Sequence, residues 1–144
     1  MSDLFIKNTI LENGLNADIL IKNGKIVEVS NSIEGMSDNI PKIDAEGWLA
    51  CPPFIDSHFH LDATLSYGMP RINQSGTLLE GISLWGELKP TLKMDDLIER
   101  ASNLCRWSIA KGTLAIRSHV DVSGKNLLGV EAMLQVREKF KDLI

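Results

Sequence analysis

Short apolar runs alternate with polar residues over the first fifty positions, a pattern typical of β-strands with one buried face. The clearest signal is Asn23-Gly24 between two β-prone runs. It predicts a hairpin, because both central residues of a type I′ turn need a positive φ. The expected strands are residues 4–7, 18–22, 25–29 and 40–49, the last with a turn at Glu46-Gly47. Residues 1–50 are therefore expected to form a small, β-sandwich-like antiparallel sheet domain.

From residue 51 onward, strand and helix patterns alternate. One short apolar run ends in His58 and His60, and a second β-prone run covers Thr113–Arg117. Between them, Asp95–Lys111 is expected to be a helix, because its apolar residues recur at three- and four-residue spacing. Those residues are Leu97, Ile98, Ala101, Leu104, Cys105 and Ile109. A last helix is expected over Leu127–Leu143, with Leu127, Val130, Met133 and Leu134 turned inward. A strand, a helix and a second strand predict one right-handed β-α-β unit of a parallel sheet.

Residues 63–90 form a long connection rich in Gly, Ser, Asn and Pro. Within it, residues 77–85 predict a short helix that carries Leu78, Ile82 and Trp85 on one side. From the residues alone, this side is expected to pack as a stripe of the core.

His58 and His60 lie where the first of the two strands after residue 50 ends. Side chains alternate faces along a strand, so the two imidazoles share one face and could bind a divalent metal ion together. Two ordinary histidines in a half-exposed strand remain the alternative. His119 ends the second strand. Because parallel strands end at one rim, the three histidines are expected to share a pocket. The alternative for His119 is a core histidine hydrogen-bonded to Asp121 or to backbone. Alternation also places Asp56 on the face of His58, where it is expected to support the site and not to act catalytically.

Composition excludes several classes of partner. The chain is 44% apolar and 24% charged, as is ordinary for a globular protein, and its net charge of −4 gives no basis for binding nucleic acid or an anionic membrane. No apolar run approaches the roughly 20 residues that span a bilayer. Cys51 and Cys105 form no Cys-x-x-Cys pattern, and no export signal is visible at the N-terminus, so a reduced, cytoplasmic protein is expected.

Three segments, in this order, resemble the amidohydrolase superfamily of metal-dependent hydrolases. They are residues 52–62, with Pro52-Pro53 where most members carry Pro-Gly, residues 73–82, and residues 117–122. The second and third are similar to the cytosine deaminase branch. The resemblance covers nearly the whole chain and implies an α/β fold, a (β/α)8 TIM-type barrel preceded by the small sheet domain. Such a barrel typically takes about 250 residues, so residues 51–144 are expected to form only its first strands and helices.

The resemblance implies hydrolytic deamination of cytosine or a related aminated heterocycle, a small-molecule substrate. One divalent metal ion, zinc or iron, would be held by His58, His60, a third histidine and an aspartate, and would lower the pKa of a bound water toward neutrality. The resulting hydroxide would attack the ring carbon that bears the amine, while an acid/base passes a proton to the departing ammonia. The missing ligands and the acid/base would come from later strands. The 144-residue chain alone is therefore expected to bind metal poorly and to turn over no substrate.

The same resemblance implies roles for other residues. Leu78 would press on the plane of a bound pyrimidine ring, and Asn73 and Gln74 would shape the pocket mouth or orient its loop. His119 would orient the metal ligands without binding the ion, with Asp121 as its partner. Two alternatives stay open: an amidohydrolase acting on another amino- or alkylamino-substituted ring (a triazine, a purine analogue or creatinine), and a non-catalytic fragment that needs a partner chain. A homo-oligomer is also open.

Overall fold

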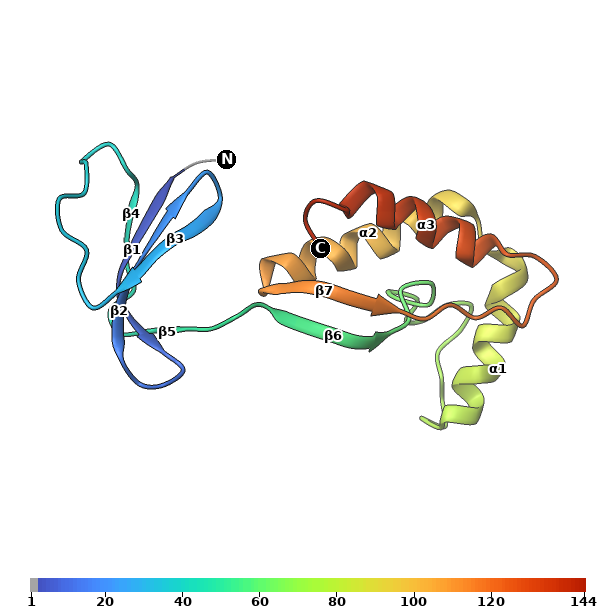
Figure 1. Cartoon of the computed structure of the whole chain (residues 1–144). Coiled ribbons are helices and arrows are strands. Elements are labelled where there is room, and N and C mark those ends of the chain that lie inside the picture. The colour runs from blue at the N-terminus through green and yellow to red at the C-terminus, as the bar shows by residue number, and fades with distance from the viewer. Residues whose placement is uncertain (1–2) are drawn as a thin grey trace. The chain divides into compact units, whose positions relative to one another are not determined.

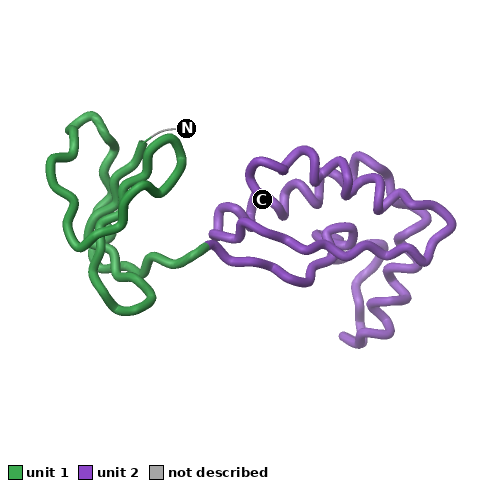
Figure 2. Tube along the Cα trace, in the orientation of Figure 1, with its two compact units in different colours: residues 1–52 green, residues 53–144 purple. Residues whose placement is uncertain are grey.

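The computed structural model describes residues 3–144 and divides into two compact units, residues 1–52 and residues 53–144 (Figure 2). The first unit is a β-sheet, and the second contains a two-stranded sheet and three α-helices (Figure 1). The mixed α/β class expected from the sequence is thus confirmed. No helix described between residues 3 and 144 combines the length and the apolar character needed to cross a membrane.

The first unit is one five-stranded sheet with the order β3-β2-β1-β4, in which β5 also pairs with β1. Its strands are β1 (Leu4–Leu11), β2 (Asn16–Lys22), β3 (Lys25–Ser30), β4 (Lys42–Asp44) and β5 (Leu49–Ala50). The predicted hairpin joins β2 to β3, with φ of 52° at Asn23 and 74° at Gly24. Phe5, Leu20 and Ile33 form the buried core of this unit.

The expectation of a purely antiparallel sheet is wrong for β4 and β5, which both pair parallel to β1. The expected single strand over residues 40–49 is also divided in two, because Glu46 and Gly47 adopt φ of 50° and 84° and turn the chain between them. The physical reason is the long return of the chain through residues 31–41. This segment returns the chain to the end of the sheet where β1 begins, so β4 runs in the same direction as β1 and pairs with it in parallel.

The second unit contains the predicted β-α-β arrangement. Its elements are β6 (Phe54–Phe59), α1 (Leu78–Leu88), the 3-10 turn η1 (Lys89–Thr91), α2 (Met94–Ala110), β7 (Thr113–Ser118) and α3 (Leu128–Phe140). β6 and β7 pair in parallel, and α2 and α3 pack side by side over one face of this pair (Figure 1). Two strands cannot close a barrel, so the TIM-type barrel remains a prediction.

The core of the second unit lies between α2, α3 and the strand pair. Its buried residues are Leu61, Leu97, Ala101, Cys105, Ala132, Met133, Val136 and Phe140. The inward face predicted for α2 is correct. On α3, Met133 is buried as predicted but Leu127 and Leu134 are about half exposed, because the helix begins at Leu128 and its buried stripe runs through Ala132, Val136 and Phe140.

The predicted core stripe on α1 is wrong. Leu78 and Ile82 are exposed, at 78% and 58%, and the buried side chains are Leu84 and Leu88. The helix extends one turn beyond the predicted end, and the added turn brings in Leu88, which shares a face with Leu84 four residues earlier. That pair, not Leu78, packs inward.

Candidate functional site

The carboxyl ends of β6 and β7 bring the three histidines of the chain together. The ring of His58 lies 3.9 Å from that of His119, centroid to centroid, with an interplanar angle of 20°. His60 lies 5.7 Å from each of the other two rings. The expectation that these residues meet at one rim agrees with this geometry, because His58 lies near the end of β6, His60 directly follows β6, and His119 directly follows β7.

Backbone pairing fixes the two strand ends relative to each other. Phe59 pairs with Ser118 in the parallel ladder, and the His119 amide donates to the Phe59 carbonyl at 2.6 Å. Just beyond, the Leu61 amide donates to the Ser118 hydroxyl at 3.3 Å. The two strands therefore end in register, and their terminal side chains face the same space.

The three rings differ in their surroundings. His58 is exposed, and the His60 side chain is 48% exposed. His119 is half-buried, and its Nδ1 atom is buried with no hydrogen-bond partner among residues 3–144. Asp121, the expected partner of His119, has its carboxylate bonded elsewhere.

The Asp121 carboxylate joins α1 and η1 to the loop after β7. Its Oδ2 accepts from Trp85 Nε1 and from Lys89 Nζ, both at 2.8 Å, and its Oδ1 accepts from the Ser123 amide at 2.7 Å. The ammonium of Lys89, followed by the Ser123 and Trp85 donors, holds the pKa of Asp121 well below its ordinary value. Asp121 is thus a structural bridge in this chain, and the expected Asp121–His119 pairing is not formed.

Two more acids flank the histidine pair. The Asp56 carboxylate accepts from the backbone amide of His58 at 3.2 Å, which suits the supporting role expected of it. Asp62 is only 2% exposed, and its Oδ2 accepts from the Asp121 amide at 2.9 Å. Its other oxygen, Oδ1, lies 3.4 Å from Nδ1 of His60.

A second cluster of contacts orders the loop before α1. Arg71 bonds Glu87 through Nε and Nη2 at 3.2 and 2.9 Å, and Glu80 through Nη1 at 2.9 Å. Glu80 also accepts from the hydroxyl and amide of Ser75 and from the amide of Gln74. These bonds, together with the one from Arg71, lower the pKa of Glu80 to about 2. The Glu80 amide donates to the hydroxyl of the N-cap Thr77, which is one half of a capping box; the other half is absent, because the Thr77 amide donates to the Ser75 hydroxyl and not to the Glu80 carboxylate.

Asn73 fastens the tip of the same loop. Its side-chain oxygen accepts from the Gly76 amide at 2.8 Å, and its side-chain nitrogen donates to the Thr77 carbonyl at 3.0 Å. Leu78 follows as the first residue of α1 and projects into solvent. Figure 1 places α1 beyond the carboxyl ends of β6 and β7.

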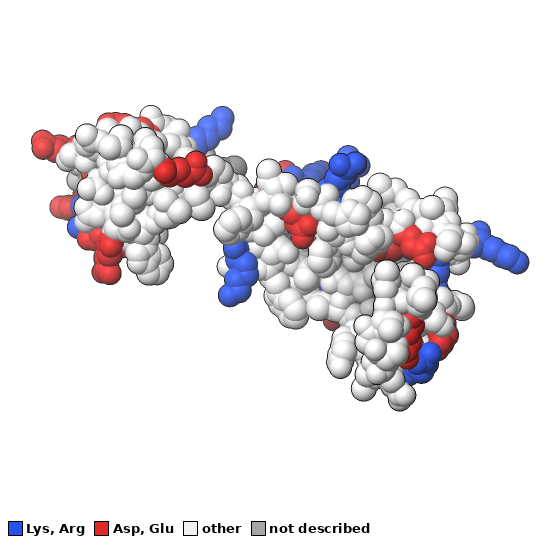
Figure 3. Space-filling view, turned by 90° about the horizontal axis from the view of Figure 1, so that it is seen from below, with Lys and Arg blue, Asp and Glu red and all other residues white. Residues whose placement is uncertain are grey.

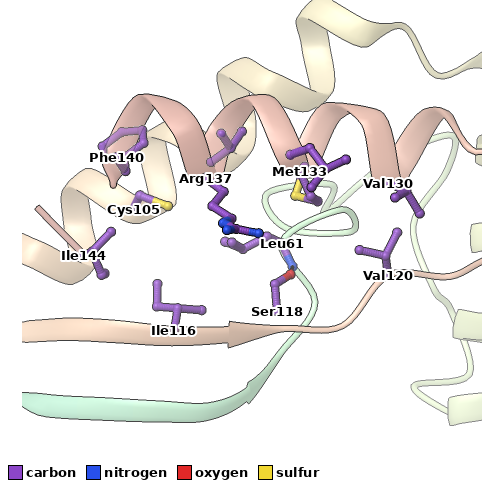
Figure 4. A pocket seen from close by; sticks show the side chains of 12 residues that line it. Leu61, Cys105, Ile116, Ser118, Val120, Val130, Met133, Arg137, Phe140 and Ile144 are labelled. Carbon is purple, nitrogen blue, oxygen red and sulfur yellow. Dashed lines mark hydrogen bonds between the residues drawn. The ribbon is translucent and has the colours of Figure 1, made fainter. Parts of the chain in front are cut away.

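A separate apolar groove lies between α3 and β7 (Figure 4). Aliphatic side chains such as Ile116, Val120 and Val130 dominate its lining, and Arg137 and Ser118 supply its polar groups. None of the histidines lines it. This groove is therefore distinct from the histidine cluster.

The histidine cluster suits a divalent ion in the type of its donors but not in their number. Imidazole nitrogen is a good ligand for zinc and iron, and two of the rings are exposed at one strand end. Within residues 3–144, however, no three His, Cys, Asp or Glu side chains are arranged so that they could hold an ion. His58 and His60 would be two of the roughly four ligands that a zinc site requires.

Sequence reasoning gave no role to Asp62 or Lys89, and it placed Trp85 only in the expected core stripe, not as a donor to Asp121. Asp62 continues the two-residue spacing of His58 and His60, and that spacing was the one local signal available. Trp85 and Lys89 stand four apart on consecutive helical turns, which places them on one face. Their common partner is more than 30 residues away along the chain, and no local pattern identifies it.

No protein-family model matches the chain. The N-isopropylammelide isopropyl amidohydrolase of Pseudomonas sp. (strain ADP) is 31% identical over 152 residues, which cover 99% of this chain and 36% of that protein. Among solved structures, 5-methylcytosine deaminase from Klebsiella pneumoniae, liganded with phosphonocytosine, matches with a TM-score of 0.85 and 35% identity over 97% of this chain and 34% of that one. N-isopropylammelide isopropylaminohydrolase from Burkholderia multivorans matches with a TM-score of 0.75 and 25% identity over 100% of this chain and 36% of that one.

The chain thus spans about one third of the length of the relatives it matches. Its fold and its sequence agree with theirs over almost all of its own length. The homologues and structural neighbours of this chain are members of the amidohydrolase superfamily, and over almost its whole length the chain is similar to a portion of a cytosine deaminase-like hydrolase.

Proposed function

We propose that this chain supplies two metal ligands and part of the substrate pocket of a hydrolase that deaminates cytosine or a related aminated heterocycle. The observation that carries the proposal is the meeting of three imidazoles at the carboxyl ends of β6 and β7. Active sites of β/α barrels lie at that face of the strands. The likeness to 5-methylcytosine deaminase over 97% of the chain supports the same reading.

In this proposal, His58 and His60 hold a divalent ion, zinc or iron. Such an ion, when bound, makes a water molecule available as a nucleophile near neutral pH. The overall reaction replaces the ring amine by oxygen and releases ammonia, with one water consumed. In this reaction, the residues of this chain would bind the ion and orient the substrate ring.

Contacts at the strand ends and in the loop before α1 support the remaining assignments. His119 stacks on His58 and limits the rotation of its ring. Leu78 presents an exposed aliphatic side chain that would cover one face of a flat heterocycle. Asn73, with Glu80 and Arg71, holds the loop that leads to Leu78 in one conformation, so that little ordering remains to be done when the ring binds.

The test uses the product of the complete gene that encodes this chain. It is assayed for ammonia release from cytosine, 5-methylcytosine and guanine, and for isopropylamine release from N-isopropylammelide, together with its zinc and iron content. His58→Ala and His60→Ala should each abolish turnover and lower the bound metal. Asp142→Asn, an exposed acid near the end of α3, is the control and should change neither. A fully active His60→Ala variant with unchanged metal content would refute the proposal.

A second candidate is hydrolysis of an alkylamino group from a triazine ring. It is favoured by the 31% identity to the Pseudomonas N-isopropylammelide hydrolase across 99% of the chain. The same panel separates the two, because only the triazine substrate would release isopropylamine. A preference for N-isopropylammelide over the pyrimidines would establish the second candidate in place of the first.

A further inference from the structure

Asp62 differs from the other acids described at the strand ends, because its side chain is buried and only one of its two carboxylate oxygens has a hydrogen-bond partner. It is 2% exposed, so its charge is removed from solvent. Oδ2 accepts from the Asp121 amide at 2.9 Å, while Oδ1 is buried and has no hydrogen-bond partner among residues 3–144. Burying an unsatisfied carboxylate oxygen is unfavourable, by about 1–3 kcal/mol or more for a charged group. A donor next to Oδ1 is therefore strongly favoured.

The nearest basic group to Oδ1 is on a histidine. Nδ1 of His60 lies 3.4 Å away, just beyond a normal hydrogen bond. The two residues sit in one tight turn, since the Ala63 amide donates to the His60 carbonyl at 3.2 Å. A rotation of the exposed ring together with a small shift would bring Nδ1 into hydrogen-bond geometry with Oδ1.

Asp62 is also held from its other side. The first turn of α3 lies against it, so closely that a Cβ added at Gly129 would stand 3.8 Å from the Asp62 Cβ and 3.1 Å from Val120 Cγ1. The bond from the Asp121 amide fixes the carboxylate in the plane it occupies. The ring of His60, which is 48% exposed, is the more mobile partner.

We propose that Asp62 is a positioning residue for His60, whose carboxylate holds the imidazole in the tautomer with hydrogen on Nδ1. An ionised carboxylate can only accept, so the nitrogen that faces it carries the hydrogen, and a neutral imidazole has just one. The lone pair then stays on Nε2, the atom left to bind a metal ion. This inference rests on the proposed function of His60 as a ligand, but the tautomer itself is a property of the chain without metal.

His58 provides an internal comparison. Its ring stacks on His119 at 3.9 Å, and the nearby Asp56 carboxylate is bonded to the His58 backbone amide instead of its ring. The tautomer of His58 is therefore expected to be independent of Asp62.

The first experiment measures the tautomers directly. In the ¹⁵N-labelled 144-residue chain without metal, above the pH at which histidine is charged, two-bond ¹⁵N–¹H correlation spectra should show His60 with hydrogen on Nδ1. Asp62→Asn should reduce the ratio of the Nδ1–H to the Nε2–H form of His60 several-fold and leave His58 unchanged. Asp56→Asn, the same substitution on the other side of the pair, should leave His60 unchanged. A wild-type His60 with hydrogen on Nε2 would overturn the inference whether or not any variant folds.

The second experiment measures the consequence for binding, with Zn²⁺ alone as the probe and the complete gene product as the protein. Loss of such a supporting carboxylate typically weakens metal binding by about 10–100-fold, and Asp62→Asn should do so while Asp56→Asn does not. Equal affinity of wild type and Asp62→Asn would also refute the positioning role. A wild-type protein that binds no Zn²⁺ or iron would refute the proposed function instead, and the tautomer of His60 would still decide whether Asp62 holds it.

Discussion

Removing the charge of Asp121 should loosen the attachment of α1 to the rest of the second unit. Asp121 accepts from Trp85 and Lys89 at 2.8 Å and from the Ser123 amide at 2.7 Å. In Asp121→Asn the amide keeps a similar shape and can still accept from Trp85, but the charge that pairs with Lys89 is lost. The change therefore isolates the ionic part of the bridge.

The magnitude lies between those of a surface and a buried ion pair. The side chains of Lys89 and Asp121 are 21% and 26% exposed, so the pair is more protected than an exposed one, which is worth about 0–1 kcal/mol. Removing one partner of a fully buried pair costs about 3–5 kcal/mol. For Asp121→Asn we expect a loss of about 1–2 kcal/mol in the free energy of unfolding, near the value of one hydrogen bond to a charged group.

The assay is urea unfolding of the 144-residue chain followed by the fluorescence of Trp85. Trp48 and Trp107 are 76% and 59% exposed and can be replaced by Phe at little cost, which leaves Trp85 as the only reporter. With a urea dependence of about 1–3 kcal/mol per molar, the loss should lower the midpoint by roughly 0.3–2 M. Asp142→Asn, at an exposed site, is the matched control and should leave the midpoint in place.

Acid should remove the difference between the two proteins. The pKa of Asp121 is lower in the folded chain than its ordinary value, so its stabilisation is complete above the unfolded pKa, about 3.9, and is lost as pH falls through the lower folded pKa. The midpoints of parent and Asp121→Asn should thus differ by a constant amount from pH 7 down to about pH 4–5 and converge in more acidic solution. Equal midpoints at pH 7 would refute the reasoning, because the bridge would then contribute nothing.

Three further outcomes follow from the described contacts. Leu97→Ala should lower the free energy of unfolding by about 2–5 kcal/mol, measured by denaturant titration, because Leu97 is 1% exposed between α2 and α3; an effect below 1 kcal/mol would contradict that packing. In a pH titration followed by NMR, the amide of Ser75 should report a Glu80 midpoint near pH 2, far below the ordinary value of 4.5, since the loop contacts favour the charged form and weaken only below that pH; Arg71→Ala should move the midpoint upward. Of the two thiols, Cys51 should react with a thiol reagent at once and Cys105 only on unfolding, because burial both shields the Cys105 thiol and raises its pKa.

Much of the fold was predictable because its determinants are local. The Asn23-Gly24 turn depends on two residues that tolerate positive φ, and α2 depends on a repeat of apolar residues that one helical face buries. The parallel pairing of β4 and β5 was not predictable in this way. It depends on where the chain returns to the sheet after residues 31–41, and no local pattern encodes that path.

The same distinction between local and long-range determinants applies to the candidate site. That His58, His60 and His119 meet follows from strand alternation and from the common rim of parallel strands, and both can be inferred from sequence. The partner of Asp121 cannot, because its two side-chain donors, Trp85 and Lys89, come from a helical segment 36 and 32 residues earlier. Ion pairs between elements depend on how those elements pack, so only the structure identifies them.

One residue links the two halves of the candidate site through two different groups. The backbone amide of Asp121 donates to Asp62, beside His60. The carboxylate of Asp121 accepts instead from Trp85, in α1, and from Lys89, in η1. A side-chain substitution at Asp121 removes only the second link, since the backbone amide is retained in every variant except proline. Asp121→Asn should therefore disturb the α1 side of the site and spare His60, whereas Asp62→Asn should act on His60 and spare α1. If both substitutions changed the His60 tautomer equally, the two links would have to act as one unit, and Asp62 would not be positioning His60 on its own.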